Sequence, residues 1–207
     1  NTDLIIQKSI KMITDGASII DIGGESSRPG AKKISVNEEI QRVIPSLINF
    51  KKNGLEVQIS LDTRNLSTMK LGYENGADII NDISGFRDID KIQFVSKLKL
   101  PIIVMHMQNQ PHNMQIEPEY NFAPVDIYKF LSNRVNQLIE MGIDKSNIVI
   151  DPGIGFGKNL HHNLEILRNI TLFHSLGVPV LIGASRKSLI GEVTIKGYKH
   201  QGINKRS

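Results

Sequence analysis

Six short apolar segments of the chain end in residues that could bind a ligand. The end residues are Asp21 with Gly23 and Gly24, Asp62 with Thr63, Asn81 with Asp82, His106, Asp151 with Pro152 and Gly153, and Gly183 followed by Ser185, Arg186 and Lys187. Side chains of this kind can hydrogen-bond a ligand, and glycines let the backbone approach one closely. We therefore expect a binding site where these segment ends meet.

The densest of these ends is DIGGESSRPGA, residues 21–31. A carboxylate, two glycines, a glutamate, two hydroxyls, an arginine and a proline follow directly after an apolar run. A buried strand has no structural need for so much polar and conformationally permissive sequence. The pattern indicates that something is bound at this loop.

The segment DPGIGFGKN, residues 151–159, is similar to two nucleotide-binding motifs but fits neither. In the phosphate loop G-x-x-x-x-G-K-[ST], Pro152 takes the place of the first glycine and Asn159 replaces the final hydroxyl residue. In the dinucleotide motif G-x-G-x-x-G, Lys158 occupies the third glycine position. What remains is a strand ending in Asp151, followed by either a simple turn or a ligand-binding loop.

The segment SRKS, residues 185–188, offers two cations and two hydroxyls, which suit an anion or a ring oxygen but also fit a basic loop without function. The histidines argue against zinc. His161 and His162 are adjacent and point in different directions along a helix, and His106 with His112 lacks cysteines or a nearby carboxylate set.

The elements that must position these residues follow a regular rhythm. Helix-like segments close with Gly16, Gly54, Gly76, Gly142 and Gly177, and a short β-branched run follows each. Continuously apolar runs, typical of strands covered on both faces, are residues 17–22, 57–62, 78–83, 102–107, 147–151 and 178–184. Alternating strands and helices predict an α/β fold with a parallel sheet.

Polar residues at nearly every strand end favour a (β/α)₈ barrel over an open doubly wound sheet, because a barrel gathers its active site from many strand ends. About six of the eight βα units are present. We therefore expect one barrel domain over residues 1–207 that is incomplete at both ends. Its six strands would leave two sheet edges to be covered.

Composition limits the function classes. The 207 residues suit a single domain, and the sequence has no apolar run long enough to cross a membrane and no signal-like start. The absence of cysteine fits a reducing cytoplasm. A net charge of +4, with cations and anions interspersed, does not imply nucleic-acid binding. The basic stretch from Lys196 to Arg206 is read as a solvated loop rather than a polyanion site.

Taken together, the motifs resemble those of bacterial dihydropteroate synthases. The matching segments, in the order and approximate spacing of that family, are IIDIGGESSRPGA (19–31), SLDT (60–63), IINDIS (79–84), VMHMQ (104–108), IDPGIGFGKN (150–159) and GASRKS (183–188). The resemblance spans essentially the whole chain. It implies a (β/α)₈ barrel that joins 6-hydroxymethyl-7,8-dihydropterin diphosphate to p-aminobenzoate with Mg²⁺ and releases pyrophosphate.

The resemblance also implies roles for individual residues. Asp62, Asn81 and Asp151 would line the pterin pocket, and Lys187 would reach the pterin ring. Ser27 and Arg28 would order the diphosphate and aminobenzoate side, Ser185 and Phe156 would border the aminobenzoate, and Arg186 would lie near it. Asp151, Lys187 and Arg28 would be catalytic. The metal-ligating asparagine of the family follows a strand that this chain lacks, so we expect no metal ligand here.

These roles agree with the chemistry of the substrates. The pyrimidinone edge of a pterin is rich in N–H donors, which carboxylates and an asparagine amide can match. Asp151 would stabilise a ring-delocalised cation formed as pyrophosphate leaves, and Arg28 and Lys187 would act on the diphosphate or the ring. Gly23, Gly24 and Gly30 would let the loop carry Ser27 over the site as a lid. The family is commonly dimeric, which implies a homodimer.

Two alternatives stay open at this point. One is a folate-binding methyltransferase barrel, which would not need SRKS or the full GGESSRPGA segment. The other is a pterin-binding fragment without catalytic activity. Turnover by the 207-residue chain would exclude the second alternative.

Overall fold

The computed structural model describes residues 2–27, 30–109, 111 and 113–184. Its strands are β1 (Ile19–Gly23), β2 (Gln58–Asp62), β3 (Ile79–Asp82), β4 (Ile102–Met105) and β5 (Ile148–Asp151). Its helices are α1 (Thr2–Thr14), α2 (Val36–Lys52), α3 (Leu66–Glu74), α4 (Ile89–Leu98), α5 (Ala123–Glu140), the 3₁₀ turn η1 (Lys145–Asn147), α6 (Leu160–Arg168) and α7 (Ile170–His174). The predicted alternation of strands and helices is confirmed.

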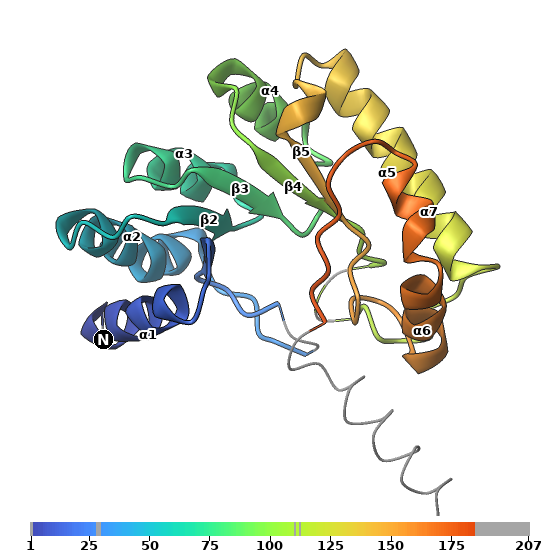
Figure 1. The fold of residues 1–207 in the computed structure, drawn as a ribbon, viewed down its shortest axis with the longest axis horizontal. Helices are drawn as coiled ribbons and strands as arrows, with labels where there is room; N and C mark the ends of the chain where they lie inside the picture. Colours follow the sequence, from blue (N-terminus) through green and yellow to red (C-terminus); the bar gives the residue numbers. More distant parts are fainter. Residues whose placement is uncertain (1, 28–29, 110, 112, 185–207) are drawn as a thin grey trace, which may run out of the picture.

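The sheet is parallel, and its strands lie in chain order, β1-β2-β3-β4-β5. Figure 1 shows the strands fanning out in that order with the helices along their outer side. An open doubly wound sheet would reverse its strand order at a switch point, and this sheet does not. The described residues therefore form part of a (β/α)₈ barrel, as the sequence predicts.

The sixth predicted strand, residues 178–184, is only partly formed among the described residues. Val180 makes one parallel bridge with Ile150, and the amide of Leu181 donates to the carbonyl of Ile150 over 2.8 Å. Pro179 has no amide hydrogen, so it can offer only its carbonyl, which accepts from Ile150 at 3.0 Å. The segment extends the sheet beyond β5 without becoming a regular strand.

Of two other predictions from the sequence, one is confirmed and one is wrong. All five predicted helix-ending glycines have positive φ, from 59° at Gly54 to 104° at Gly16 and Gly76. The prediction that every strand is covered on both faces is wrong for β1, where Ile19 is 45% exposed and Ile20 only 5%. β1 is the edge of the described sheet, so Ile19 has a neighbouring strand on one side only.

The core lies between the strands and the outer helices. On α5, Leu131, Val135 and Leu138 recur at helical spacing and are buried in the same cluster as the β4 residues Ile102 and Val104. None of the helices in the described ranges combines the length and apolar character that a membrane span requires. The helical layer thus fixes the strands and leaves their carboxyl ends free to carry polar side chains.

Candidate active site

Asp62 and Asn81 stand next to each other at the carboxyl ends of two neighbouring strands. Asp62 is the last residue of β2 and is in register with Asn81 of β3. The Asn81 amide Nδ2 donates to Oδ1 of Asp21 on β1 over 3.4 Å. Three consecutive strands therefore place two carboxylates and one amide along a single edge.

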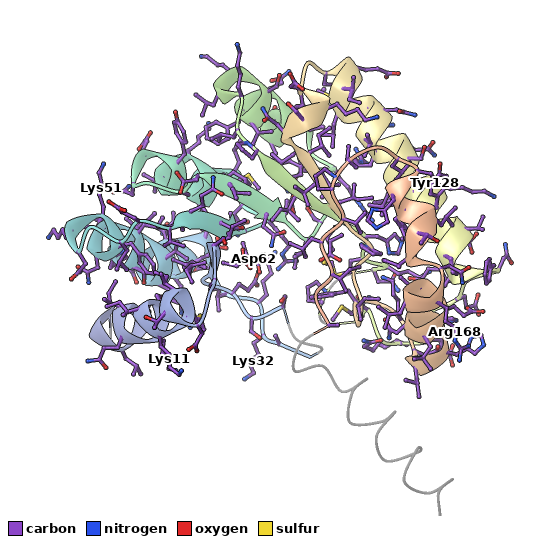
Figure 2. The ribbon with its side chains drawn as sticks, in the orientation of Figure 1. Lys11, Lys32, Lys51, Asp62, Tyr128 and Arg168 are labelled. Carbon is purple, nitrogen blue, oxygen red and sulfur yellow. The ribbon has the colours of Figure 1, made fainter. Side chains whose placement is uncertain are left out.

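This edge is central in the molecule. Figure 2 shows Asp62 in the middle, where the strand ends meet, whereas Lys11, Lys51 and Arg168 project from the outer helices. The predicted convergence of the β2 and β3 end residues is confirmed. A ligand at this position would meet hydrogen-bonding groups from several strands at once.

The carboxyl group of Asp62 is in an unfavourable environment for its negative charge. Burial raises its pKa well above the ordinary value, and the nearby carboxylates of Asp21, Asp82 and Glu39 raise it further. The Arg64 guanidinium acts in the opposite direction. Ligand N–H groups that donate to Asp62 would relieve this repulsion, so the site favours a donor-rich partner.

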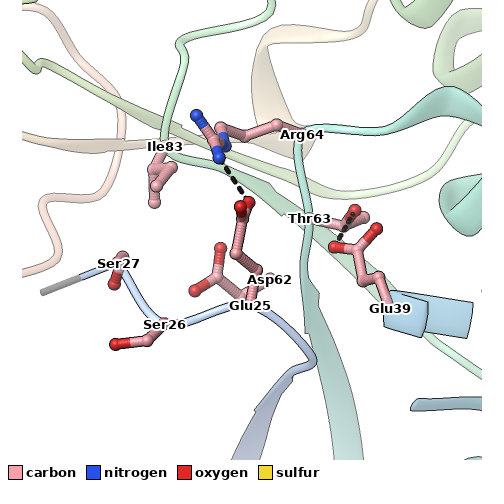
Figure 3. Close-up of a pocket in the computed structure, with 8 residues that line it drawn as sticks. All are labelled: Glu25, Ser26, Ser27, Glu39, Asp62, Thr63, Arg64 and Ile83. Carbon is pink, nitrogen blue, oxygen red and sulfur yellow. Dashed lines mark hydrogen bonds and ion pairs between the residues drawn. The ribbon is translucent and has the colours of Figure 1, made fainter. Parts of the chain in front are cut away.

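A cavity opens beside Asp62, between the loops that follow β1 and β2. Figure 3 shows the side chains that line it: Glu25, Ser26, Ser27, Glu39, Asp62, Thr63, Arg64 and Ile83. Ser27 was predicted as a site residue and shares this cavity with Asp62. Glu25 pairs with Arg64, and its Oε1 accepts from the amide of Ile34 at 3.3 Å. The two loops are thereby tied together around the cavity.

Asp151 is the predicted acid at the end of β5, and it is 7% exposed. Its Oδ1 accepts a hydrogen bond from the amide of Gly153 at 2.7 Å. Gly153 has φ of +70°, and a Cβ atom there would lie 2.0 Å from the His106 carbonyl oxygen. The close approach that requires this glycine is therefore to protein backbone, whereas a ligand was one of the two alternatives that the sequence left open.

Phe156 packs on an apolar cluster at the same edge of the sheet. The cluster consists of Ile83, Met105, Met107 and Met114, each at most 5% exposed. Ile83 also lines the cavity beside Asp62. Because one residue belongs to both, a polar wall and an apolar wall adjoin, which is the surface that a flat ring with a polar edge requires. Met105 and Met107 are therefore residues of the apolar wall.

Lys158 and His106 form a buried pair behind this wall. Lys158 is 3% exposed, and its Nζ lies 3.0 Å from His106 Nδ1. The same ammonium donates to the carbonyls of Phe156 at 2.8 Å and His106 at 3.3 Å. Burial, Lys158 and Arg87 hold the pKa of His106 well below its ordinary value. Lys158 therefore fastens the 152–159 loop to the end of β4.

The end of that loop begins α6. The Asn159 side chain accepts from the amide of His162 at 2.9 Å, and His162 Nδ1 faces the Asn159 amide at 3.4 Å, a reciprocal capping box. The residue that breaks the phosphate-loop pattern is thus a helix cap. One of the two adjacent histidines acts in the same cap.

Several predicted residues cannot be placed. Arg28, Ser185, Arg186, Lys187 and the basic stretch 196–206 lie outside the described residues. Within the described ranges, no group of three or more His, Asp or Glu side chains could hold a metal ion.

Comparison with known proteins identifies the family to which the chain belongs. A profile described as "Pterin binding enzyme" matches residues 1–207. The chain belongs to the pterin-binding enzyme family. Within the family it resembles the dihydropteroate synthase of Haemophilus influenzae, with 42% identity over 186 residues, 90% of this chain and 67% of the relative. The Escherichia coli enzyme is 41% identical over 182 residues, 88% of this chain.

Solved structures of the family have the same fold. A Yersinia pestis dihydropteroate synthase with a sulfonamide drug complex superposes with a TM-score of 0.89 at 38% identity, covering 94% of this chain and 70% of that one. A Xanthomonas albilineans dihydropteroate synthase in complex with 7,8-dihydropteroate gives a TM-score of 0.83 at 31% identity, covering 97% and 70%. The chain spans about two thirds of its curated relatives, 67% of the Haemophilus protein and 64% of the Escherichia protein.

The sequence analysis missed Glu39, which lines the cavity from α2 and is 1% exposed. Its spacing of four residues from Val43 and eight from Leu47, both buried, places it on the inner face of the helix. That spacing was the available signal for a buried carboxylate. Ile83 was also missed, because an isoleucine after a strand gives no sign that it borders a polar cavity.

Proposed function

We propose that the protein is a dihydropteroate synthase, which condenses 6-hydroxymethyl-7,8-dihydropterin diphosphate with p-aminobenzoate to give 7,8-dihydropteroate and pyrophosphate. The observation that carries the proposal is the edge formed by Asp62 and Asn81 next to the wall that holds Phe156. The relatives named dihydropteroate synthase and the Xanthomonas complex with 7,8-dihydropteroate support the same substrate class.

The polar edge suits the pyrimidinone side of a pterin. Asp62 and Asp151 would accept from ring and amino N–H groups, and the Asn81 amide can both donate and accept. An analogue without these groups would leave acceptors unpaired at a desolvated site, so it would bind poorly. Ile83, Met105 and the other cluster residues would contact the flat ring.

The reaction needs no covalent intermediate with the protein. The bond from the pterin methylene carbon to the diphosphate oxygen breaks first, and its electron pair leaves with pyrophosphate. The resulting cation is delocalised over the ring, where the Asp151 carboxylate would stabilise it. The aromatic amine, held beside Phe156, then forms the C–N bond and loses a proton. Lys187, Arg28, Ser185 and Arg186 are proposed partners of the ring, diphosphate and aminobenzoate on the resemblance alone.

The resemblance also implies Mg²⁺ and a homodimer for the whole protein. Neither rests on a contact among the described side chains. Magnesium would be tested by measuring pterin diphosphate affinity with and without the ion, and the dimer by sedimentation of the purified protein.

The deciding experiment is calorimetric titration of the chain with a pterin diphosphate analogue, followed by assay of pyrophosphate release with p-aminobenzoate. Saturable binding and turnover are expected for a synthase. Binding without turnover would contradict the proposed activity and identify a pterin-binding fragment. Transfer of a methyl group from a reduced folate would instead identify a methyltransferase barrel.

A further inference from the structure

Glu39 is a buried carboxylate whose side chain accepts hydrogen bonds from the β2–α3 turn and the first turn of α3. Its Oε1 accepts from Thr63 Oγ1 at 2.8 Å, and its Oε2 accepts from Asn65 Nδ2 at 2.8 Å and Thr68 Oγ1 at 2.6 Å. Glu39 belongs to α2 and lies at least 24 residues before these partners in the sequence. Glu39 therefore joins α2 to the segment that begins immediately after Asp62.

The turn itself is built around this carboxylate. Thr63 Oγ1, which donates to Glu39, also accepts from the amide of Asn65 at 3.1 Å. The amide of Thr63 donates to the Asn81 carbonyl at 3.0 Å, which joins the same turn to the end of β3. Thr63 is thus held on two sides, and the backbone that carries the Asp62 side chain is held with it.

The opposite side of Glu39 supports the loop after β1. A Cβ atom at Gly24 would lie 2.9 Å from both the Cγ and the carbonyl oxygen of Glu39. The loop backbone thus packs directly on this residue before it continues to Glu25 and Ser27. Figure 3 shows Glu39 reaching Thr63 at the rim of the Asp62 cavity.

A residue that only filled the space at this position would not need to be a carboxylate. The ion pairs within the described ranges do not include Glu39, so neutral hydroxyl and amide groups satisfy a charge that is costly to bury. Multiple acceptor sites on one carboxylate allow three donors, two from the turn and one from α3, to be held at once. An apolar residue could fill the volume but could not fix the turn.

We propose that Glu39 is a positioning residue, which fixes the β2–α3 turn and so directs the Asp62 carboxylate toward the pterin. The inference rests on the proposed function for the identity of the ligand. Glu39 also acts on Asp62 through its charge. The groups that face Asp62 are the carboxylates of Asp21, Asp82 and Glu39, which raise its pKa, and the guanidinium of Arg64, which lowers it.

Two measurements on Glu39→Gln test the proposal. Carboxyl NMR titration without ligand should show a lower Asp62 pKa, because one of the three repelling charges is gone. Titration with a pterin analogue should show binding at least about tenfold weaker at pH 7.5, because an amide offers fewer acceptor sites to the turn. The acid limb of the affinity profile should move to lower pH.

The matched control is Glu38→Gln, which changes the adjacent, exposed residue that pairs with Arg42. It should retain the wild-type Asp62 titration and pterin affinity. Unchanged Asp62 titration together with unchanged affinity in Glu39→Gln would overturn the inference. If the wild-type chain does not bind the pterin analogue, the proposed function is wrong. The ligand-free titration still decides whether Glu39 shifts the pKa of Asp62.

A second pair of variants covers misfolding of Glu39→Gln. Thr63→Val removes one donor to Glu39, whereas Thr63→Ser retains the hydroxyl. Weak pterin binding by Thr63→Val with near-normal binding by Thr63→Ser would support the positioning role. Equal affinities in both variants would contradict it.

Discussion

Asp62 and Asn81 are register partners in the ladder between β2 and β3, so their side chains leave neighbouring strands at the same level. A parallel ladder fixes the spacing of such a pair through backbone hydrogen bonds. The donor and acceptor groups of the edge are thus set before any ligand arrives, and the cost of organising them is met on folding.

Asp62→Asn should weaken binding of a pterin analogue about 10- to 100-fold. The asparagine keeps the side-chain shape but replaces one acceptor oxygen by a donor, which leaves a ligand N–H without a partner. Calorimetry would measure the affinity. Asp15→Asn, at an exposed acid just after α1, is the control and should bind normally. Wild-type affinity for Asp62→Asn would contradict the pterin assignment of this edge.

Phe156→Ala should weaken binding of p-aminobenzoate about 3- to 10-fold, since the lost aromatic contact contributes roughly 0.5–1.5 kcal/mol. Pterin affinity should change less, because the polar edge at Asp62 is untouched. Binding of the aminobenzoate would be followed in the presence of pyrophosphate and a pterin analogue. Phe122→Ala, at an exposed phenylalanine before α5, should have no effect. An equal loss of p-aminobenzoate affinity in both variants would show that Phe156 is not part of the binding site.

Lys91→Met should destabilise the fold by about 3–5 kcal/mol, because it leaves the Asp82 charge buried without its cation. The Lys91 ammonium lies 3.1 Å from Asp82 and 2.9 Å from Asp88, and the Asp82 side chain is fully buried. Urea unfolding would measure the change. Lys97→Met, on the last turn of the same helix, should cost under about 1 kcal/mol. Similar stability of the two variants would show that the buried pair is dispensable.

Gly153→Ala should destabilise the fold by at least about 2 kcal/mol, since it combines a backbone clash with an unfavourable φ. The new methyl group would lie 2.0 Å from the His106 carbonyl oxygen. Gly16→Ala separates the two causes, because Gly16 also has positive φ but has open space around it. A cost of about 1 kcal/mol is expected there. Equal melting temperatures for the two variants would argue against the clash.

The stability of the chain should fall below about pH 6.5 through His106. Burial, Lys158 and Arg87 lower the pKa of His106 in the folded state, so the unfolded chain binds the proton more readily. The stabilisation is present above the unfolded pKa and is lost as the pH falls toward the folded pKa. Urea unfolding would measure the free energy of unfolding at pH 7.5 and 5.5. The decrease between the two pH values should be smaller by about 1 kcal/mol in His106→Gln than in the wild-type chain.

His174→Gln provides the comparison for that pH effect, because His174 is exposed at the end of α7. It should retain the wild-type loss between the two pH values. If His106→Gln also retains it, His106 does not carry the dependence.

The strand-end residues could be predicted from sequence because the signal is local. An apolar run that ends in a carboxylate or amide gives the position of Asp62, Asn81 and Asp151 without knowledge of the packing. The side-chain contacts of Glu39 are different in kind, since the nearest hydrogen-bond partner of its carboxylate lies 24 residues away. Only the helical spacing to Val43 indicated its burial, and nothing in the sequence indicated which turn it would hold.

The role of individual glycines was the weaker part of the prediction. The helix-ending glycines follow a local rule, and their positive φ values were expected. At Gly153 the close neighbour is the backbone of β4's loop, which belongs to another segment of the chain. A permissive residue shows that something approaches closely, and only the tertiary structure shows what it is.

The order of the strands in the sheet also bears on how the protein can fold during synthesis. Each strand pairs with the one made just before it, so no ladder has to wait for a strand from farther along the chain. During synthesis β2 can pair once β1 and α2 have emerged, and β3 can follow before β5 exists. The proposed substrate-binding edge can therefore be assembled in the order of translation, with Asp62 first, Asn81 next and Asp151 last.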